Sequence, residues 1–274
     1  MLPDPAIEVL RPGLPRGRFR AVLFDFDGTL SLLREGWPKV MTEMMLEELH
    51  RTGANQPEDR FAATVEAIVV GLNGRPTIVQ MQHLAAEIER LGGQPAAPAT
   101  YARQYQERLM RIVQGRYDRL RTGRAAPAEW AVPGCYALLN RLRARGLPLV
   151  LASGTEAEHV RREAELLKLN SYFGEAIFAP DSGDPHFSKR AVIEHVLREH
   201  GLRGEELLAF GDGVVETEEV RRVGGVAVAV ASEEPPRRGV NARKRDRLIR
   251  AGADVVIADY ECHERLLRWL FAED

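Results

Sequence analysis

AVLFDFDGTL, residues 21–30, joins a short apolar run to a pair of acids. The run, Ala21 to Phe24, is typical of a buried strand. Asp25 and Asp27 follow at its end, and Gly28 permits an unusual turn beside them. A carboxylate at the end of a buried strand is costly unless it binds a cation or reacts. The alternative is an Asx turn with the glycine at its tip.

Further apolar runs follow this one, and helical patterns alternate with them. The runs lie at 147–152, 176–178, 207–210, 226–230 and 254–258. Apolar residues at helical spacing occur over 134–145, 157–169 and 189–200. Strands that alternate with helices predict a parallel sheet with helices on both faces. The predicted fold class is therefore α/β, with a Rossmann-like core.

More than a hundred residues separate the first two predicted strands, far beyond an ordinary crossover. This insert contains helical patterns at roughly 37–51, 58–71, 77–91 and 100–114, with Gly- and Pro-rich stretches between them. It predicts an all-helical domain inserted into the first. The expected organisation is an N-terminal extension over 1–19, a core over 20–33 and 132–274, and a helical domain over 34–131. The extension holds four prolines and is expected to be loosely ordered.

The composition of the 274-residue chain is that of an ordinary globular protein. The net charge of −2 favours neither a nucleic-acid surface nor an anionic membrane. No apolar run reaches the roughly 18 residues of a membrane span, and Cys135 and Cys262 form no CxxC pair. Six basic residues lie within 237–247, but neighbouring acids favour a solvated helix. We expect a cytoplasmic monomer or homodimer with a small-molecule partner and no nucleic-acid or membrane partner.

VLFDFDGTL, residues 22–30, resembles the first motif of the haloacid dehalogenase superfamily. LASGT at 151–155, a helix that starts with Lys189, and GDGVVE at 211–216 resemble the later motifs, in the same order. The resemblance spans roughly 20–33 and 132–258. It implies that Asp25 is a nucleophile that forms an aspartyl-phosphate and that Asp27 is the general acid and base. Asp27 also argues against the dehalogenase branch, which lacks an acid there.

The second and third motifs imply groups that hold the phosphoryl oxygens. Ser153 is expected to donate a hydrogen bond, helped by backbone N–H groups from Gly154 onward. The alternative is a plain helix N-cap. Lys189 is expected to neutralise the nucleophile and the phosphoryl group, with Arg190 and Lys168 as competitors and a solvated lysine as the alternative.

The resemblance also implies a Mg²⁺ site. Its ligands would be Asp25, the backbone carbonyl of Asp27, and Asp212, with Glu216 bound directly or through a water. Oxygen-only ligands of this kind suit Mg²⁺ rather than Zn²⁺. Relatives often have Asp at the position of Glu216, so direct ligation by this residue is left open.

The helical insert resembles the mobile cap of phosphoglycolate phosphatase and β-phosphoglucomutase relatives, which closes over the site. Arg75 lies in a loop that matches a substrate-contacting loop and is expected to bind a second anionic group or another polar handle. The alternative is an exposed Arg in a turn. The predicted reaction is hydrolysis of a small phosphomonoester, either a sugar phosphate or an organic acid phosphate. A phosphomutase and a non-catalytic binding module are the alternatives.

Overall fold

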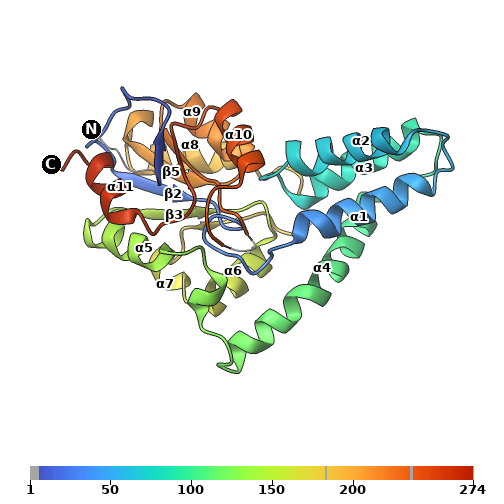
Figure 1. Cartoon of the computed structure of the whole chain (residues 1–274), viewed down its shortest axis with the longest axis horizontal. Coiled ribbons are helices and arrows are strands. Elements are labelled where there is room, and N and C mark those ends of the chain that lie inside the picture. The colour runs from blue at the N-terminus through green and yellow to red at the C-terminus, as the bar shows by residue number, and fades with distance from the viewer. Residues whose placement is uncertain (1–5, 183, 235–236, 274) are drawn as a thin grey trace.

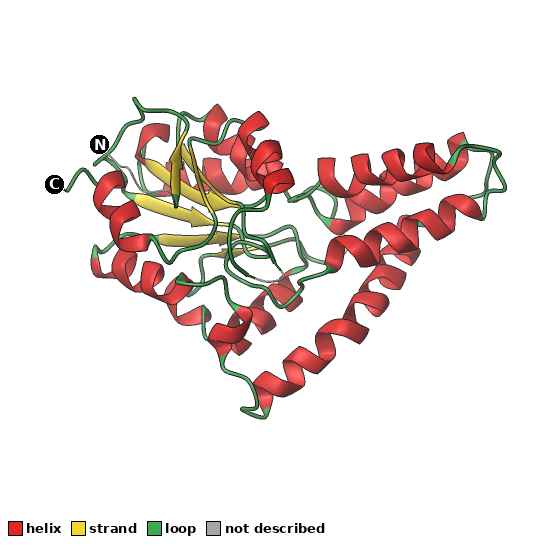
Figure 2. Ribbon diagram, viewed as in Figure 1, coloured by secondary structure: helices red, strands yellow, loops and turns green. Residues whose placement is uncertain are grey.

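The computed structural model describes residues 6–182, 184–234 and 237–273. The strands of the described residues form one sheet in the order β1-β7-β6-β5-β2-β3-β4 (Figures 1 and 2). They are β1 Ile7–Val9, β2 Ala21–Phe24, β3 Leu149–Ala152, β4 Ile177–Phe178, β5 Leu207–Gly211, β6 Val226–Val230 and β7 Val255–Ile257. Neighbouring strands from β7 to β4 are parallel, and β1 is antiparallel to β7. The predicted parallel α/β core is confirmed.

The sheet order determines where a site can form. β2 lies between β3 and β5, and Val22 is in register with Leu149 on one side and Leu208 on the other. Parallel strands end at the same edge of a sheet, so the loops after these three strands are neighbours. Ligands of open α/β sheets bind outside this carboxyl edge.

Helices cover both faces of the sheet. Val22 and Phe24 pack into the cluster that contains Leu138 of α5, whereas Ala21 and Leu23 face the cluster of α8 and α9. This alternation follows from the two-residue repeat of a strand. The helices of this part are α5 Cys135–Ala144, α6 Ala157–Leu166, α7 Asn170–Phe173, α8 Lys189–Glu199, α9 Val214–Arg222, α10 Ala242–Arg250 and α11 His263–Leu270, with short 3₁₀ turns at Pro127–Trp130 and Gly204–Glu206.

The insert between β2 and β3 is helical, as predicted, and lies beside the carboxyl edge of the sheet (Figure 1). We call it the cap. Its helices are α1 Trp37–His50, α2 Glu58–Gly71, α3 Thr77–Arg90 and α4 Pro98–Arg121. The prediction of 100–114 for the last helix was too short. Tyr105, Leu109, Val113 and Tyr117 are all buried at four-residue intervals, so the buried stripe continues past Gly115 and carries α4 back to the core.

The prediction of a loosely ordered extension was wrong for Ile7–Val9. This segment pairs with β7, where Ile7 is in register with Ile257, and the Ile7 side chain is buried. Arg245 of α10 also forms an ion pair with Glu8. A three-residue strand is too short to show an alternating apolar pattern in the sequence. Its formation depends on the pairing with β7 and the ion pair with α10. Residues 1–5 of the predicted extension lie outside the described residues.

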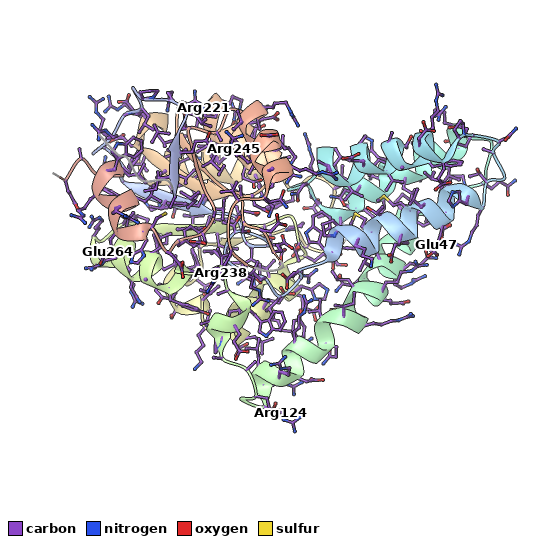
Figure 3. All side chains as sticks on the ribbon, viewed as in Figure 1. Glu47, Arg124, Arg221, Arg238, Arg245 and Glu264 are labelled. Atoms are coloured by element: carbon purple, nitrogen blue, oxygen red, sulfur yellow. The ribbon has the colours of Figure 1, made fainter. Side chains whose placement is uncertain are left out.

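The surface carries charges of both signs. In Figure 3, Arg221 and Arg245 lie on the outside of the core, and Glu47 lies on the outside of the cap. Arg245 is paired with acids, which agrees with the solvated helix expected around it. Within the described ranges, no helix combines the length and the apolar character that crossing a bilayer requires.

Candidate active site

Three buried acids meet at the carboxyl edge of the sheet. Asp25 follows β2, Asp212 follows β5, and Glu216 lies in the first turn of α9. Each offers a carboxylate oxygen, and these oxygens lie within 4.8 Å of one another. A buried cluster of carboxylates is unfavourable without cations. Oxygen donors at this spacing fit a divalent cation such as Mg²⁺.

Lys189 supplies one positive charge to this cluster. Its Nζ donates to Asp25 Oδ1 at 2.5 Å and to Glu216 Oε2 at 2.9 Å. Ser188 caps α8, so Lys189 is its first residue and is fully buried. Burial alone would lower the pKa of Lys189, but the two carboxylates raise it above its usual value. Arg190 and Lys168 are exposed and do not reach the cluster.

Burial disfavours the ionised form of Asp25, and Lys189 favours it. Burial raises the pKa of Asp25 well above its usual range, and the attraction of Lys189 opposes that rise. The nearby charges of Glu216 and Asp212 raise it further. A second lysine, Lys244 of α10, lies 3.0 Å from Asp212 through its Nζ. It is buried, so the expected solvated helix was wrong for this residue.

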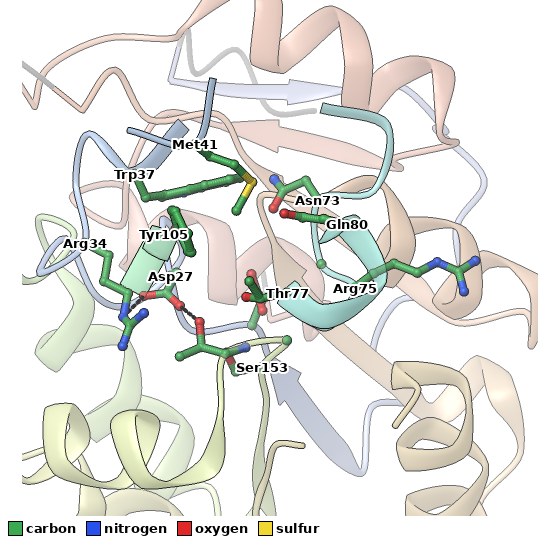
Figure 4. Close-up of a pocket in the computed structure, with 14 residues that line it drawn as sticks. Asp27, Arg34, Trp37, Met41, Asn73, Arg75, Thr77, Gln80, Tyr105 and Ser153 are labelled. Carbon is green, nitrogen blue, oxygen red and sulfur yellow. Dashed lines mark hydrogen bonds and ion pairs between the residues drawn. The ribbon is translucent and has the colours of Figure 1, made fainter. Parts of the chain in front are cut away.

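Asp27 occupies a different environment from Asp25. Its Oδ2 accepts a hydrogen bond from Thr155 Oγ1 at 2.8 Å, and its Oδ1 lies 3.9 Å from Arg34 Nε (Figure 4). Burial raises the pKa of Asp27 to about 7, against the opposing charge of Arg34. Gly28, directly after Asp27, has a φ of 76°. A Cβ at this glycine would lie 2.2 Å from Asp212 Oδ2.

A cavity between core and cap contains both acids. Its core lining includes Ser153, Gly154 and Thr155, and its cap lining includes Trp37, Asn73, Thr77, Gln80 and Tyr105. Ser153 is buried, and its Oγ accepts from the N–H of Thr155 at 3.1 Å. A second cavity of about 330 Å³ lies beside the first, and both are lined by Arg34, Thr77 and Thr155.

The loop between α2 and α3 rests directly on the core. A Cβ at Gly154 would lie 2.7 Å from the backbone oxygen of Arg75, and one at Gly74 would lie 2.8 Å from Glu216 Oε2. The loop therefore needs glycine on both sides of the contact. The Arg75 side chain is exposed and points away from Asp27 and Ser153 (Figure 4). The residue nevertheless lines the cavity that contains both acids.

The sequence interpretation missed several residues at this site. Thr155 lies within the second motif, at 151–155, and this position was the one sequence feature that could have indicated its place in the site. Lys244 was hidden in a basic run that resembles a solvated helix. Arg34 lies in the first connection to the cap, and its partner, Glu163, is 129 residues away in sequence. Only the tertiary structure brings these residues to the acids.

A comparison of the sequence with models of protein families agrees with the motif strands, the acid cluster and the helical insert. A model of the haloacid dehalogenase-like hydrolases matches residues 19–224, which is most of the chain. The protein belongs to this family. It is therefore a hydrolase of the haloacid dehalogenase type with an inserted helical cap.

Individual relatives of this haloacid dehalogenase-like hydrolase agree with the assignment. A phosphoglycolate phosphatase from Synechococcus elongatus is 28% identical over 153 residues, which cover 56% of this chain and 68% of that protein. Among solved structures, a predicted phosphoglycolate phosphatase from Haemophilus somnus has a TM-score of 0.58 at 14% identity, covering 91% of this chain and 98% of that one. A β-phosphoglucomutase from Clostridium difficile has a TM-score of 0.59 at 11% identity, covering 93% and 98%. At such identities the solved structures support the shared fold alone.

Proposed function

We propose that this protein is a Mg²⁺-dependent phosphatase that hydrolyses a small phosphomonoester through an aspartyl-phosphate on Asp25. One observation carries the proposal. Two acids in one cavity have different partners, since Asp25 is bound by Lys189 and Asp27 by Thr155. An ionised nucleophile and a group that exchanges protons near neutral pH need such different environments.

The positions of the side chains support the following proposed steps. Asp25 attacks the phosphorus, and the bond to the leaving oxygen breaks while Asp27 donates a proton to that oxygen. Ser153 and the N–H of Gly154 orient the phosphoryl oxygens, and Lys189 neutralises their charge. Asp27 then takes a proton from a water that attacks the same phosphorus. The bond to Asp25 breaks, phosphate leaves, and both acids return to their initial states.

The acid cluster is the proposed metal site. Asp25, the backbone carbonyl of Asp27, and Asp212 would hold Mg²⁺, with Glu216 bound directly or through a water. When bound, the ion supplies positive charge that lets a carboxylate approach a phosphate. The fit rests on the three buried carboxylates, whose oxygens lie within 4.8 Å of one another.

The cap side of the cavity is proposed to receive the leaving group. The relative from S. elongatus is a phosphoglycolate phosphatase, and the neighbouring cavity of about 330 Å³ has room for a larger group. The proposed substrate is therefore a phosphorylated sugar or a short organic acid phosphate. A phosphomutase would use the same aspartyl-phosphate but return the phosphoryl group to a sugar. The products separate the two, since only a phosphatase releases one inorganic phosphate per substrate consumed.

Phosphate release should require a divalent metal. A panel of phosphorylated sugars and organic acids, assayed with Mg²⁺, should include substrates that release inorganic phosphate, and excess EDTA should abolish that release. Asp212→Asn should weaken Mg²⁺ binding at least about tenfold, because it removes a charged ligand. Isothermal titration with Mg²⁺ measures this without turnover. Full activity in EDTA would overturn the metal assignment, and no release with any substrate would overturn the function.

Gly154→Ala should lower kcat/KM by about 10- to 100-fold, because small misplacements of catalytic groups are costly. The new Cβ would meet the Arg75 backbone oxygen at 2.7 Å, so the cap loop must move off the site. Gly71→Ala is the matched control, since a Cβ there meets nothing within 4 Å. Steady-state kinetics and thermal melts of both variants test this. Equal kcat/KM in the two variants would show that the loop contact is not needed.

A further inference from the structure

A buried ion pair lies beside Asp27 and is not used in the proposed mechanism. Arg34 comes from the first connection to the cap, and Glu163 comes from α6 of the core. Both are buried, and Glu163 is 0% exposed. Arg34 Nε and Nη2 each lie 2.8 Å from Glu163 Oε1. Tyr117 of the cap helix α4 donates to the same oxygen at 2.5 Å. Three separate segments of the chain therefore meet at one carboxylate.

Stability alone does not account for this cluster. Taking a guanidinium and a carboxylate out of water costs several kcal/mol per ion, and well-packed apolar residues often serve a fold equally well. The Glu163 Oε2 atom is buried and has no hydrogen-bond partner among the described residues. The pair is thus unfavourable for stability, and Arg34 lies directly beside Asp27 in the lining of the cavity.

The geometry relates the pair to one oxygen of Asp27. Thr155 holds Oδ2, whereas Oδ1 is buried and no hydrogen bond from the described residues reaches it. Arg34 Nε lies 3.9 Å from this oxygen, which is too far for a hydrogen bond but close enough to attract the carboxylate. Glu163 holds Arg34 at that distance. In this structure the oxygen is therefore oriented by charge, and no hydrogen bond from the described residues occupies it.

Building on the proposed function, we infer that Arg34 is a positioning residue for Asp27, held in place by Glu163 and Tyr117. Arg34 orients the Asp27 carboxylate so that Oδ1 faces the leaving oxygen, and Glu163 prevents a direct hydrogen bond from Arg34 that would occupy Oδ1. Because Tyr117 belongs to the cap, the same bonds tie α4 to the core beside the site. The residue acts through Asp27 and does not itself react.

The test uses the leaving group as the readout. p-Nitrophenolate leaves without a proton, whereas the alkoxide of 2-phosphoglycolate needs one, so only the second substrate depends on a positioned acid in the first step. In Arg34→Met/Glu163→Leu, both charges are removed together, so no unpaired ion is buried. We expect the variant to fold, with a melting temperature below that of the wild type, because the buried Tyr117 hydroxyl loses its acceptor. We expect kcat/KM for 2-phosphoglycolate to fall about 10- to 100-fold and that for p-nitrophenyl phosphate to change by less than about threefold. If the panel shows that 2-phosphoglycolate is not turned over, its best alkyl phosphate takes that place.

The matched control is Arg141→Met/Glu264→Leu, which removes an ion pair that is more than half exposed on both sides. It should leave both substrates unaffected. Equal losses for both substrates in the Arg34 double variant, or no loss, would overturn the inference, since a merely structural role does not distinguish leaving groups. A loss for 2-phosphoglycolate that lies only in KM would also overturn it, because Arg34 lines both cavities and direct binding of the leaving group would affect KM rather than kcat. If the double variant does not fold, Arg34→Lys is the variant to measure, because it keeps the positive charge but lacks the planar guanidinium with its fixed donors. It should lower the ratio of kcat/KM for 2-phosphoglycolate to kcat/KM for p-nitrophenyl phosphate, as in the double variant. An unchanged ratio would overturn the inference. The proposed function fails separately, when the wild type itself releases no phosphate.

Discussion

Asp25→Asn should abolish phosphate release in the presence of Mg²⁺ and leave the protein folded. The amide has no charge with which to attack phosphorus, so no aspartyl-phosphate forms, and the loss should be on the order of 10⁴-fold or more in kcat. Folding should persist because Asn has the same shape and Lys189 keeps its bond to Glu216 at 2.9 Å. Phosphate release and a thermal melt measure the two effects separately.

A direct view of the intermediate sharpens this prediction. Wild-type protein that is quenched with acid during turnover should carry a phosphoryl group on the peptide that contains Asp25, detected by mass spectrometry. Asp25→Asn should carry none. Asp181→Asn is a suitable control, since this aspartate is exposed and outside the acid cluster. Turnover that persists in Asp25→Asn would show that another group is the nucleophile.

Asp27→Asn should slow both halves of the reaction, but to an extent that depends on the leaving group. For an alkyl phosphate the loss of general acid catalysis should cost about 10²- to 10⁴-fold in kcat/KM. For p-nitrophenyl phosphate the first half needs no acid, so Asp25 should still be phosphorylated. Because Asp27 is also the base of the second half, the intermediate should accumulate. Stopped-flow absorbance should show a burst of one p-nitrophenolate per site, followed by slow turnover. A linear time course with wild-type turnover would remove Asp27 from the mechanism.

The pH dependence of the wild type should report the same acid. The pKa of Asp27 is raised to about 7, chiefly by burial. The proton is present below that pH and lost above it, so kcat/KM for an alkyl phosphate should decline on the alkaline side of about pH 7. In Asp27→Asn the residual kcat/KM for the same alkyl phosphate should lack this decline. A decline that survives the substitution would belong to another group.

The strands that carry the site were predictable because their signals are local. β2 and β6 have the predicted bounds, since a short apolar run between turn residues needs no distant partner to be recognised. The acids at 25, 27 and 212 follow their strands directly, and parallel strands bring their ends together. The cap was predictable for a related reason, as an insert of this length cannot be a simple crossover.

The residues that the sequence did not reveal act through distant partners. β1 exists only because β7 offers an open edge. The role of Lys244 was not visible in its charged surroundings, because its partner Asp212 is 32 positions earlier in sequence. The direction of Arg75 depends on how the cap loop rests against Gly154. None of these contacts produces a repeating pattern in the sequence.

Asp25 and Asp27 show the division most clearly. The sequence by itself determined that two acids follow a buried strand, because an apolar run and a glycine turn are properties of adjacent residues. Only the tertiary structure decided that one acid meets Lys189 and the other meets Thr155 and Arg34. The physical reason is that the environment of a buried carboxylate is made by whichever side chains the fold brings near it. These come from the loop after β3, the start of α8 and the first connection to the cap.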